Sequence, residues 1–510
     1  MAEGVPTLHL KKGSAKPLHA GHPWVFAGAV ARIEGPGVSP GCEVRVVDER
    51  GTCVGRGFYS PHSAIAVRLI TRADAPITPA LLAARIDEAL RLRRDVLALG
   101  VAFPRATGQG AAEPAQAAHA ELAQAARATP PASPALNAQD SNLLAELDAQ
   151  IAKVQSFAAQ YGMDALEETA DLRRQRDALL SEAPVARASS PVSPPVALRA
   201  SASGDMSAVY PTTAYRLVNS EGDGLGGLVV DIYGDYAAVQ IGTPGMARQQ
   251  QTILDALSSR LPLKGIVDRS DNHARQLEKM DPPSAAPLFG EVPAAPFPVY
   301  ECGIEMACDL RLGHGQKTGL YLDQRDNRRR FAALAPGRNV LDVFCHGGGF
   351  ALHAARAGAR SITLLDSSAA ALELAQANLE RNHIADADLI QAEWTEGFKH
   401  LREQGRLFEL LVLDPPKFAR GKENVPQALS AYRDLNAQAA RLLAPGGILF
   451  TCSCSGNVSE VDFERAVAAG LRLSERRALL LERRGAAPDH PVPPGFDQGR
   501  YLTCLVLQVV

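Results

Sequence analysis

Two cysteines follow a short apolar segment in the C-terminal part of the sequence. Residues 447–451 predict a β-strand, and the run Cys-Ser-Cys-Ser-Gly after it contains Cys452 and Cys454. The carboxyl end of a strand in a parallel sheet faces the ligand crevice. A deprotonated thiol at that place can act as a nucleophile. Cys454 is the better candidate because Cys452 lies further inside the strand.

An acid and two prolines follow a second apolar segment, residues 408–413, which predicts a buried strand. The residues after this strand are Asp414, Pro415, Pro416, Lys417 and Phe418. The prolines end the strand ladder and fix the backbone. Their carbonyl oxygens remain as acceptors beside the Asp414 carboxylate, so the cluster suits a base that carries an amine. A simple strand terminator is the alternative interpretation.

A thiol beside such a cluster predicts a particular reaction. Carbon 5 of cytosine or uracil is a poor nucleophile, but addition of a thiolate at carbon 6 makes carbon 5 enamine-like. Carbon 5 can then attack a methylsulfonium group, and loss of its proton with β-elimination releases the thiolate. Methylation of a base amine needs no such cysteine.

A glycine-rich loop precedes both elements in the sequence. Residues 339–344 predict a strand that ends at Phe344, and residues 350–357 predict an alanine-rich helix. Between them lie Cys345, His346, Gly347, Gly348 and Gly349. Glycines let a backbone approach a ligand closely and turn tightly into a helix. The loop lacks the glycine spacing that cradles a pyrophosphate, and a methyl donor without phosphate needs none.

Acidic residues follow the next two predicted strands. Asp366, with Ser367 after it, ends the strand over 361–365, where an acid suits hydrogen bonding to ribose hydroxyls. Glu393 follows a short strand over 388–390 and can accept from an adenine amine, while Trp394 packs on the ring. Packing in the core is the alternative for Trp394. These elements predict a nucleoside cofactor, S-adenosylmethionine.

The elements that position these residues alternate along the chain. From about residue 301 predicted strands and helices alternate, which indicates a parallel α/β sheet over 301–510. Short strands separated by turn residues predict a small β-rich domain over residues 1–75. These strands span 43–48, 54–59 and 65–70.

A middle α/β domain combines residues 76–100 with residues 209–300, and its first part predicts an amphipathic helix over 78–99. Between the two parts, residues 101–208 are rich in Ala, Pro, Gln and Ser, which is typical of a linker-like insertion. Helical spacing over 141–181 within it predicts a helical hairpin.

Composition excludes several classes of protein. The chain has 510 residues, of which 46% are hydrophobic and 21% charged, and no apolar run reaches the ~18 residues of a membrane span. No signal peptide is visible at Met1. The eight cysteines form neither a paired zinc motif nor a small disulfide framework, so we expect no metal and a reducing cytoplasm. The net charge of −3 leaves room only for local basic surfaces.

Several segments resemble the bacterial RlmI-type large-subunit rRNA cytosine-C5 methyltransferases. They are residues 22–26, 215–235, 316–328, 414–418, the Cys-Ser-Cys-Ser run and residues 487–491. The resemblance covers nearly the whole chain except 101–208. It implies a Rossmann-like class I methyltransferase domain with a mostly parallel sheet, preceded by a small β-barrel PUA domain and a middle α/β domain.

The resemblance also implies roles for individual residues. Cys454 would be the nucleophile, Asp414 would hold the base, and Asp366 and Glu393 would hold the ribose and adenine of the cofactor. The remaining residues expected to border the cofactor are Asp323, Gln324, Arg325, Phe344, Cys345, Gly347, Gly348, Ser367 and Trp394, with Asp414 also expected there.

The expected partner is ribosomal RNA of the large subunit, and a homodimer stays open. The PUA domain, through His22 and Trp24, and the basic residues Arg328 and Arg329 would bind RNA. Pro415, Pro416, Lys417 and Phe418 would border the base. A solvated helix face is the alternative for the run of arginines over 328–330.

The sequence departs from the family pattern in three places. The glycine loop begins Cys345-His346-Gly347, where the family usually has Ser-Tyr-Thr. Glu393 stands where an aspartate is usual, and the insertion over 101–208 interrupts the middle domain.

Two further hypotheses stay open. One is methylation of a base amine or a guanine nitrogen, although an aromatic residue usually follows the prolines directly in amine methyltransferases and Lys417 intervenes here. The other is a non-catalytic RNA-binding or assembly factor that has kept the fold.

Overall fold

A computed structural model describes residues 4–99, 212–293, 295–311, 318–419 and 421–510 of the chain. The predicted insertion, including its helical hairpin, lies outside the described residues, as do Gln316 and Lys317. Among the described residues, no helix is long and apolar enough to cross a lipid bilayer.

The N-terminal domain contains a six-stranded sheet in the order β2-β6-β5-β4-β1-β3. Its strands are β1 (Thr7–Leu10), β2 (Trp24–Phe26), β3 (Val30–Glu34), β4 (Glu43–Val47), β5 (Cys53–Tyr59) and β6 (Ile65–Thr71). The three strands predicted from sequence are therefore confirmed. Alternating apolar residues such as Leu8, Val44 and Val67 are buried because one face of the sheet forms the domain core.

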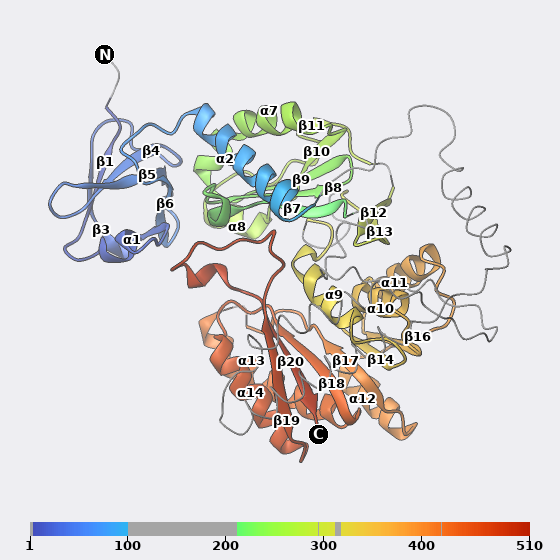
Figure 1. Cartoon of the computed structure of the whole chain (residues 1–510). Coiled ribbons are helices and arrows are strands. Elements are labelled where there is room, and N and C mark those ends of the chain that lie inside the picture. Colours follow the sequence, from blue (N-terminus) through green and yellow to red (C-terminus); the bar gives the residue numbers. More distant parts are fainter. Residues whose placement is uncertain (1–3, 100–211, 294, 312–317, 420) are drawn as a thin grey trace, which may run out of the picture. The chain divides into compact units, whose positions relative to one another are not determined.

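The middle domain is a five-stranded sheet in the order β11-β10-β9-β8-β7, with helices α2 and α7 packed beside each other on it (Figure 1). Its strands are β7 (Ala214–Asn219), β8 (Leu228–Tyr233), β9 (Tyr236–Ile241), β10 (Gly265–Asp268) and β11 (Phe289–Gly290). Its main helices are α2 (Pro79–Arg91), α6 (Pro244–Arg248), α7 (Gln250–Arg260) and α8 (Asn272–Leu277).

The helix predicted over 78–99 is shorter than expected. Thr78 caps its first turn, but α2 ends at Arg91 and the chain continues as a π-helical turn, Leu92–Val96. Within this turn the Arg93 side chain is fully buried and donates hydrogen bonds to Asp223 and to the carbonyl oxygens of Arg216 and Asp489. A two-stranded hairpin of β12 (Phe297–Glu301) and β13 (Ile304–Cys308) also crosses the predicted domain boundary at residue 300.

The C-terminal domain is a seven-stranded sheet in the order β16-β15-β14-β17-β18-β20-β19. The strands are β14 (Asn339–Val343), β15 (Ser361–Asp366), β16 (Ala387–Gln391), β17 (Phe408–Leu413), β18 (Leu443–Ser453), β19 (Ala478–Arg484) and β20 (Thr503–Val509). Strands β14 to β18 are parallel, whereas β20 runs antiparallel to both of its neighbours.

Helices cover both faces of this sheet, which explains why its strands are continuous apolar runs. One buried cluster joins the sheet to α9 (Arg325–Ala332), α10 (Gly349–Arg356) and α11 (Ala369–Arg381). A second cluster joins the other face to α12 (Trp394–Glu403), α13 (Val425–Ala440) and α14 (Glu460–Leu473). The strand order reverses between β14 and β17, and ligands of such sheets bind at the carboxyl ends of the strands beside that point.

Candidate functional site

A cavity of about 730 Å³ lies at the carboxyl ends of β14 to β18, at the point where the strand order reverses. This volume is in the range of small-molecule sites. Most of the residues predicted from sequence line it together. They are Asp323, Gln324, Arg328, Phe344, Cys345, Gly347, Asp366, Ser367, Glu393, Trp394, Asp414, Pro415, Pro416, Lys417, Phe418 and Cys454.

The loop between β14 and α10 has an unusual backbone. Phe344, His346 and Gly348 have φ angles of 62°, 48° and 75°, in the left-handed region that only glycine adopts without strain. The Phe344 N–H donates to the Leu365 carbonyl at 2.8 Å, and Gly348 is the N-cap residue of α10. Gly348 itself does not line the cavity, so it shapes the loop whereas Gly347 and Gly349 border the space.

Asp366 at the end of β15 is held by the main chain. One of its oxygens accepts from the His346 N–H at 3.0 Å and the other accepts from the Ser368 N–H at 2.9 Å. Asn378 on α11 fixes the same loop, because its side chain donates to the Gly347 carbonyl and accepts from the Ala307 N–H. Asn378 was not among the residues predicted from sequence, and no local pattern marks it within its helix.

Asp342 supports the first turn of α10. Its Oδ2 accepts from the Ala351 N–H at 3.0 Å, while Oδ1 has no hydrogen-bond partner among the described residues. Burial raises the pKa of Asp342 to about 7, with a further contribution from the charge of Asp414. The carboxyl group is therefore partly protonated near neutral pH.

Glu393 and Trp394 lie side by side at the start of α12. Glu393 is exposed at the edge of the cavity, whereas Trp394 is half-buried with its ring edge-on to Phe398 at 5.7 Å. Trp394 thus both lines the cavity and packs against the core, so the two interpretations made from sequence are compatible.

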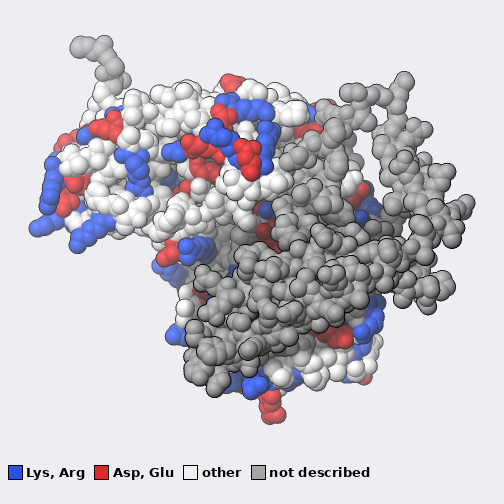
Figure 2. Space-filling view, in the orientation of Figure 1, with Lys and Arg blue, Asp and Glu red and all other residues white. Residues whose placement is uncertain are grey.

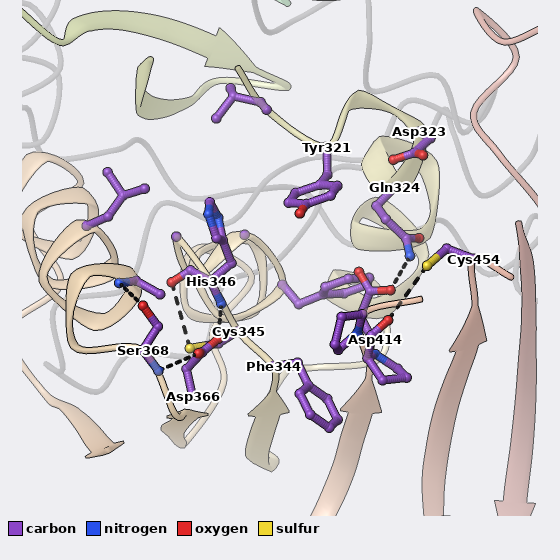
Figure 3. A pocket seen from close by; sticks show the side chains of 18 of the residues that line it. Tyr321, Asp323, Gln324, Phe344, Cys345, His346, Asp366, Ser368, Asp414 and Cys454 are labelled. Atoms are coloured by element: carbon purple, nitrogen blue, oxygen red, sulfur yellow. Dashed lines mark hydrogen bonds between the residues drawn. The ribbon is translucent and has the colours of Figure 1, made fainter. Parts of the chain in front are cut away.

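The other side of the cavity brings together the ends of β17 and β18. Figure 3 shows Asp414 and Cys454 close to each other there, away from Asp366 and the glycine loop. The Cys454 thiol lies 3.8 Å from the Pro415 carbonyl oxygen, and Asp414 Oδ1 accepts from the Gln324 amide at 2.9 Å. The thiol, the carboxylate and the proline carbonyl therefore face one space.

Two serines orient the Cys454 backbone. Ser453 and Ser455 are buried and both hydrogen-bond the Tyr432 hydroxyl, at 2.9 and 3.2 Å. Cys452 is fully buried, and its hydrogen bond with the Cys504 thiol, together with burial, raises its pKa well above the usual range. Only Cys454 of this pair lines the cavity.

Tyr321, to which the sequence analysis gave no role, also lines the cavity. Figure 3 shows it between Asp366 and Asp414, and its ring is edge-on to His346 at 5.5 Å. Burial raises the pKa of Tyr321 to about 12, as do the charges of Asp414 and Cys454. Its hydroxyl therefore stays protonated at neutral pH.

The roles expected for two arginines of α9 need correction. Arg325 is buried and forms two hydrogen bonds with Asp489, at 2.8 and 3.0 Å, so it supports the domain and does not border the cofactor. Arg328 is also buried and bonds both oxygens of Glu301 at 2.9 Å. Arg328 is thus not part of a solvated helix face, because its charge is matched inside the protein, and its expected contact with RNA stays a prediction. Arg329 is partly exposed.

The Arg328 partner Glu301 is shared with His353, whose ring nitrogen lies 3.2 Å from it. Burial raises the pKa of Glu301, but the charges of Arg328 and His353 outweigh this effect and lower it to about 2. The group is therefore a fixed anion that anchors α9 beside α10.

The side chains of His22 and Trp24 are also engaged within the protein. The His22 ring is buried and lies 3.2 Å from Gln498, while the Trp24 indole donates to Glu221 at 2.7 Å and packs edge-on against Phe496. The RNA contacts expected for these two side chains stay a prediction. Basic side chains are exposed elsewhere on the N-terminal domain (Figure 2), among them Lys11, Lys12, Lys16, Arg32 and Arg50.

Comparisons with known proteins agree with this architecture. The model of a PUA-like domain matches residues 8–72, and the model of an S-adenosylmethionine-dependent methyltransferase matches residues 265–491. The crystal structure of SMU.776 complexed with SAH has a TM-score of 0.66 and 18% sequence identity, covering 98% of this chain and 99% of that one. At this identity the likeness shows the fold, and the predicted fold class is confirmed.

Two curated relatives carry the name Ribosomal RNA large subunit methyltransferase I. The protein from Shewanella denitrificans is 40% identical over 299 residues, 58% of this chain and 75% of that protein. The protein from Photobacterium profundum is 29% identical over 498 residues, 97% of each chain. The chain therefore belongs to the Ribosomal RNA large subunit methyltransferase I family, and its cofactor is S-adenosylmethionine.

Proposed function

We propose that this protein methylates carbon 5 of a cytosine in large-subunit ribosomal RNA through a covalent bond between Cys454 and carbon 6. The observation that carries the proposal is the position of the Cys454 thiol, 3.8 Å from the Pro415 carbonyl, in the same cavity as Asp414 and Asp366. The relatives named Ribosomal RNA large subunit methyltransferase I support the choice of RNA.

The residues on one side of the cavity fit S-adenosylmethionine. Asp366 would accept from the ribose hydroxyls, and the exposed carboxylate of Glu393 would accept from the adenine amine while Trp394 packs on the ring. The glycine loop offers main chain without side chains at Gly347 and Gly349. When bound, S-adenosylmethionine supplies the methyl group as a sulfonium electrophile.

The residues on the other side fit a base that carries an amine. RNA bases in loops can be splayed out of their stack to reach such a pocket. The ionised Asp414 carboxylate and the Pro415 carbonyl would accept hydrogen bonds from the exocyclic amine, because neither group can donate one. Pro416 and Lys417 are exposed at the same edge and would border the flanking RNA.

Cys454 would perform the covalent step as a thiolate. Its sulfur forms a bond to carbon 6, and the electron pair of the 5,6 double bond moves toward carbon 5, which then takes the methyl group. The proton on carbon 5 leaves to a base, its electron pair rebuilds the double bond, and the carbon–sulfur bond breaks to return the thiolate.

The test is nucleoside mass spectrometry of large-subunit rRNA incubated with the protein and isotopically labelled S-adenosylmethionine. We expect labelled 5-methylcytidine from the wild-type protein and none from Cys454→Ala. Label in a base amine or in 7-methylguanosine would assign the protein to another reaction. Full turnover by Cys454→Ala would exclude the covalent mechanism.

A further inference from the structure

A chain of hydrogen bonds runs from the edge of the C-terminal sheet to Asp414. Arg484 at the end of β19 donates from Nε to Asn327 Oδ1 at 3.0 Å, and Asn327 Nδ2 donates to Gln324 Oε1 at 2.7 Å. Gln324 Nε2 in turn donates to Asp414 Oδ1 at 2.9 Å. Gln324 and Asn327 are buried, with exposed fractions of 2% and 1%.

The orientation of the Asn327 amide is fixed from two directions. A guanidinium group can only donate, so the atom of Asn327 that faces Arg484 must be its oxygen. The Gly485 carbonyl can only accept, and it lies 3.1 Å from the other end of the same amide. A flipped Asn327 would place a donor against the arginine and an acceptor against the carbonyl.

The Asn327 amide then fixes Gln324. Both hydrogens of Asn327 Nδ2 are used, one by Gly485 and one by Gln324, so Gln324 must present its oxygen to Asn327. Its nitrogen must therefore point to Asp414. Arg484 is itself held by Glu482 at 2.9 Å and by the Asp326 carbonyl at 3.2 Å, which anchors the start of the chain.

We propose that Gln324 is a positioning residue that fixes Asp414 as an acceptor, and that Asn327 and Arg484 determine the direction of its hydrogen bond. The inference rests on the proposed role of Asp414 in holding the base. This positioning role differs from the cofactor contact that was expected for Gln324 from the sequence. Here its amide hydrogen-bonds a residue on the opposite side of the cavity from Asp366 (Figure 3).

This arrangement favours cytosine over uracil. A donor on Oδ1 stabilises the ionised carboxylate and restricts rotation of the group, so Asp414 meets the base as an acceptor. Cytosine presents an amine at carbon 4, whereas uracil presents a carbonyl oxygen there. A carboxylate held as an acceptor bonds the first and repels the second, and such a mismatch discriminates strongly in a buried site.

The variant that tests this inference is Gln324→Glu, which keeps the shape of the side chain but removes the donor. We expect kcat with the RNA substrate to fall about 100-fold and the acid limb of the pH–rate profile to move to higher pH. The Kd for S-adenosylmethionine, measured by calorimetry, should stay within about twofold because the cofactor contacts are elsewhere. Gln324→Met, which has no amide, should give a smaller loss and a smaller shift of the same sign.

The control is Gln404→Glu, the same substitution at the exposed C-cap position that follows α12. It should leave kcat and the pH profile unchanged. An unchanged pH profile in Gln324→Glu, or a loss that follows weaker cofactor binding, would overturn the inference. The proposed function is judged separately, by the identity of the labelled nucleoside that the wild-type protein forms.

Discussion

The carboxylates on the two sides of the cavity are held by different kinds of group. On the cofactor side, the carboxylates hold main-chain groups: Asp366 accepts from the N–H groups of His346 and Ser368, and Asp342 accepts from Ala351. On the base side, the Asp414 carboxylate is held by the Gln324 side chain, which other side chains orient. A site made of main chain depends on backbone shape, whereas a site made of side chains depends on residue identity.

One of the three departures from the family pattern falls in the part of the site that the main chain holds. The unusual residues Cys345 and His346 lie in the glycine loop, where the contact to Asp366 comes from a backbone N–H that any residue but proline provides. The base side keeps the family residues Asp414, Pro415 and Cys454. We therefore expect substitutions on the two sides to differ in kind as well as in size.

The largest effect should come from Cys454→Ala. Without a thiol to add to carbon 6, methyl transfer should fall by about a thousand-fold or more, while the Kd for S-adenosylmethionine changes by less than about twofold. A filter assay with tritiated cofactor measures the first and calorimetry the second. The matched control is Cys452→Ala, which removes a fully buried thiol and should reduce kcat by less than about threefold. Equal losses in both variants would mean that the distinction between the two cysteines is wrong.

The second prediction concerns Asp342, a buried acid that accepts one main-chain hydrogen bond, and the dependence of protein stability on its protonation. Because its pKa is about 7 when folded against 3.8 when exposed, the folded state binds more protons between these values. The contribution of this group to the free energy of unfolding is thus largest below about pH 4. It decreases as the pH rises through 7, by at most about 4 kcal/mol.

Urea unfolding at several pH values from 5 to 8 measures this dependence. The free energy of unfolding should fall with rising pH in the wild-type protein and less steeply in Asp342→Asn, whose amide cannot ionise. Identical slopes for the two proteins would show that Asp342 does not change protonation in this range.

Asp366→Ala should weaken cofactor binding without affecting the chemistry on the base side. It removes the expected ribose acceptor and releases two backbone N–H groups, so we expect the Kd for S-adenosylmethionine to rise about tenfold to hundredfold. At saturating cofactor, kcat should recover to within about threefold of wild type. A large loss of kcat that saturating cofactor does not restore would contradict the assignment of Asp366 to cofactor binding alone.

The smallest effects should come from restoring the family residues in the glycine loop. Cys345→Ser and His346→Tyr leave the backbone contacts in place, so the Kd for the cofactor should change by less than about threefold in each. Burial lowers the pKa of His346, so no positive charge is lost at neutral pH when the ring is replaced. A tenfold change in either variant would show that these side chains bind the cofactor directly.

The sequence predicted the C-terminal domain well because buried parallel strands are continuous apolar runs. Asp366 and Asp414 end such runs, so their places at one edge of the sheet followed from the fold class. The glycine loop was found for the same reason, since it directly follows β14 (Asn339–Val343).

Buried polar residues were the main source of error. Arg328 lies in a run of arginines, and nothing in that run indicates that Glu301, 27 residues earlier, neutralises it. The apolar periodicity predicted a helix that continues to residue 99, but α2 ends at Arg91. Arg93, in the turn that follows, hydrogen-bonds groups from distant segments of the chain, which the local pattern does not reveal. The roles of Gln324 and Asn327 also depend on contacts across the fold, which spacing along the chain does not reveal.

The main-chain construction of the cofactor side has a consequence for regulation in the cell. Ribose and adenine are the same before and after the methyl group has left, so the contacts proposed for Asp366, Glu393 and the glycine loop would hold donor and by-product alike. We expect S-adenosylhomocysteine to compete with comparable affinity. The rate of RNA modification would then depend on the ratio of these two metabolites.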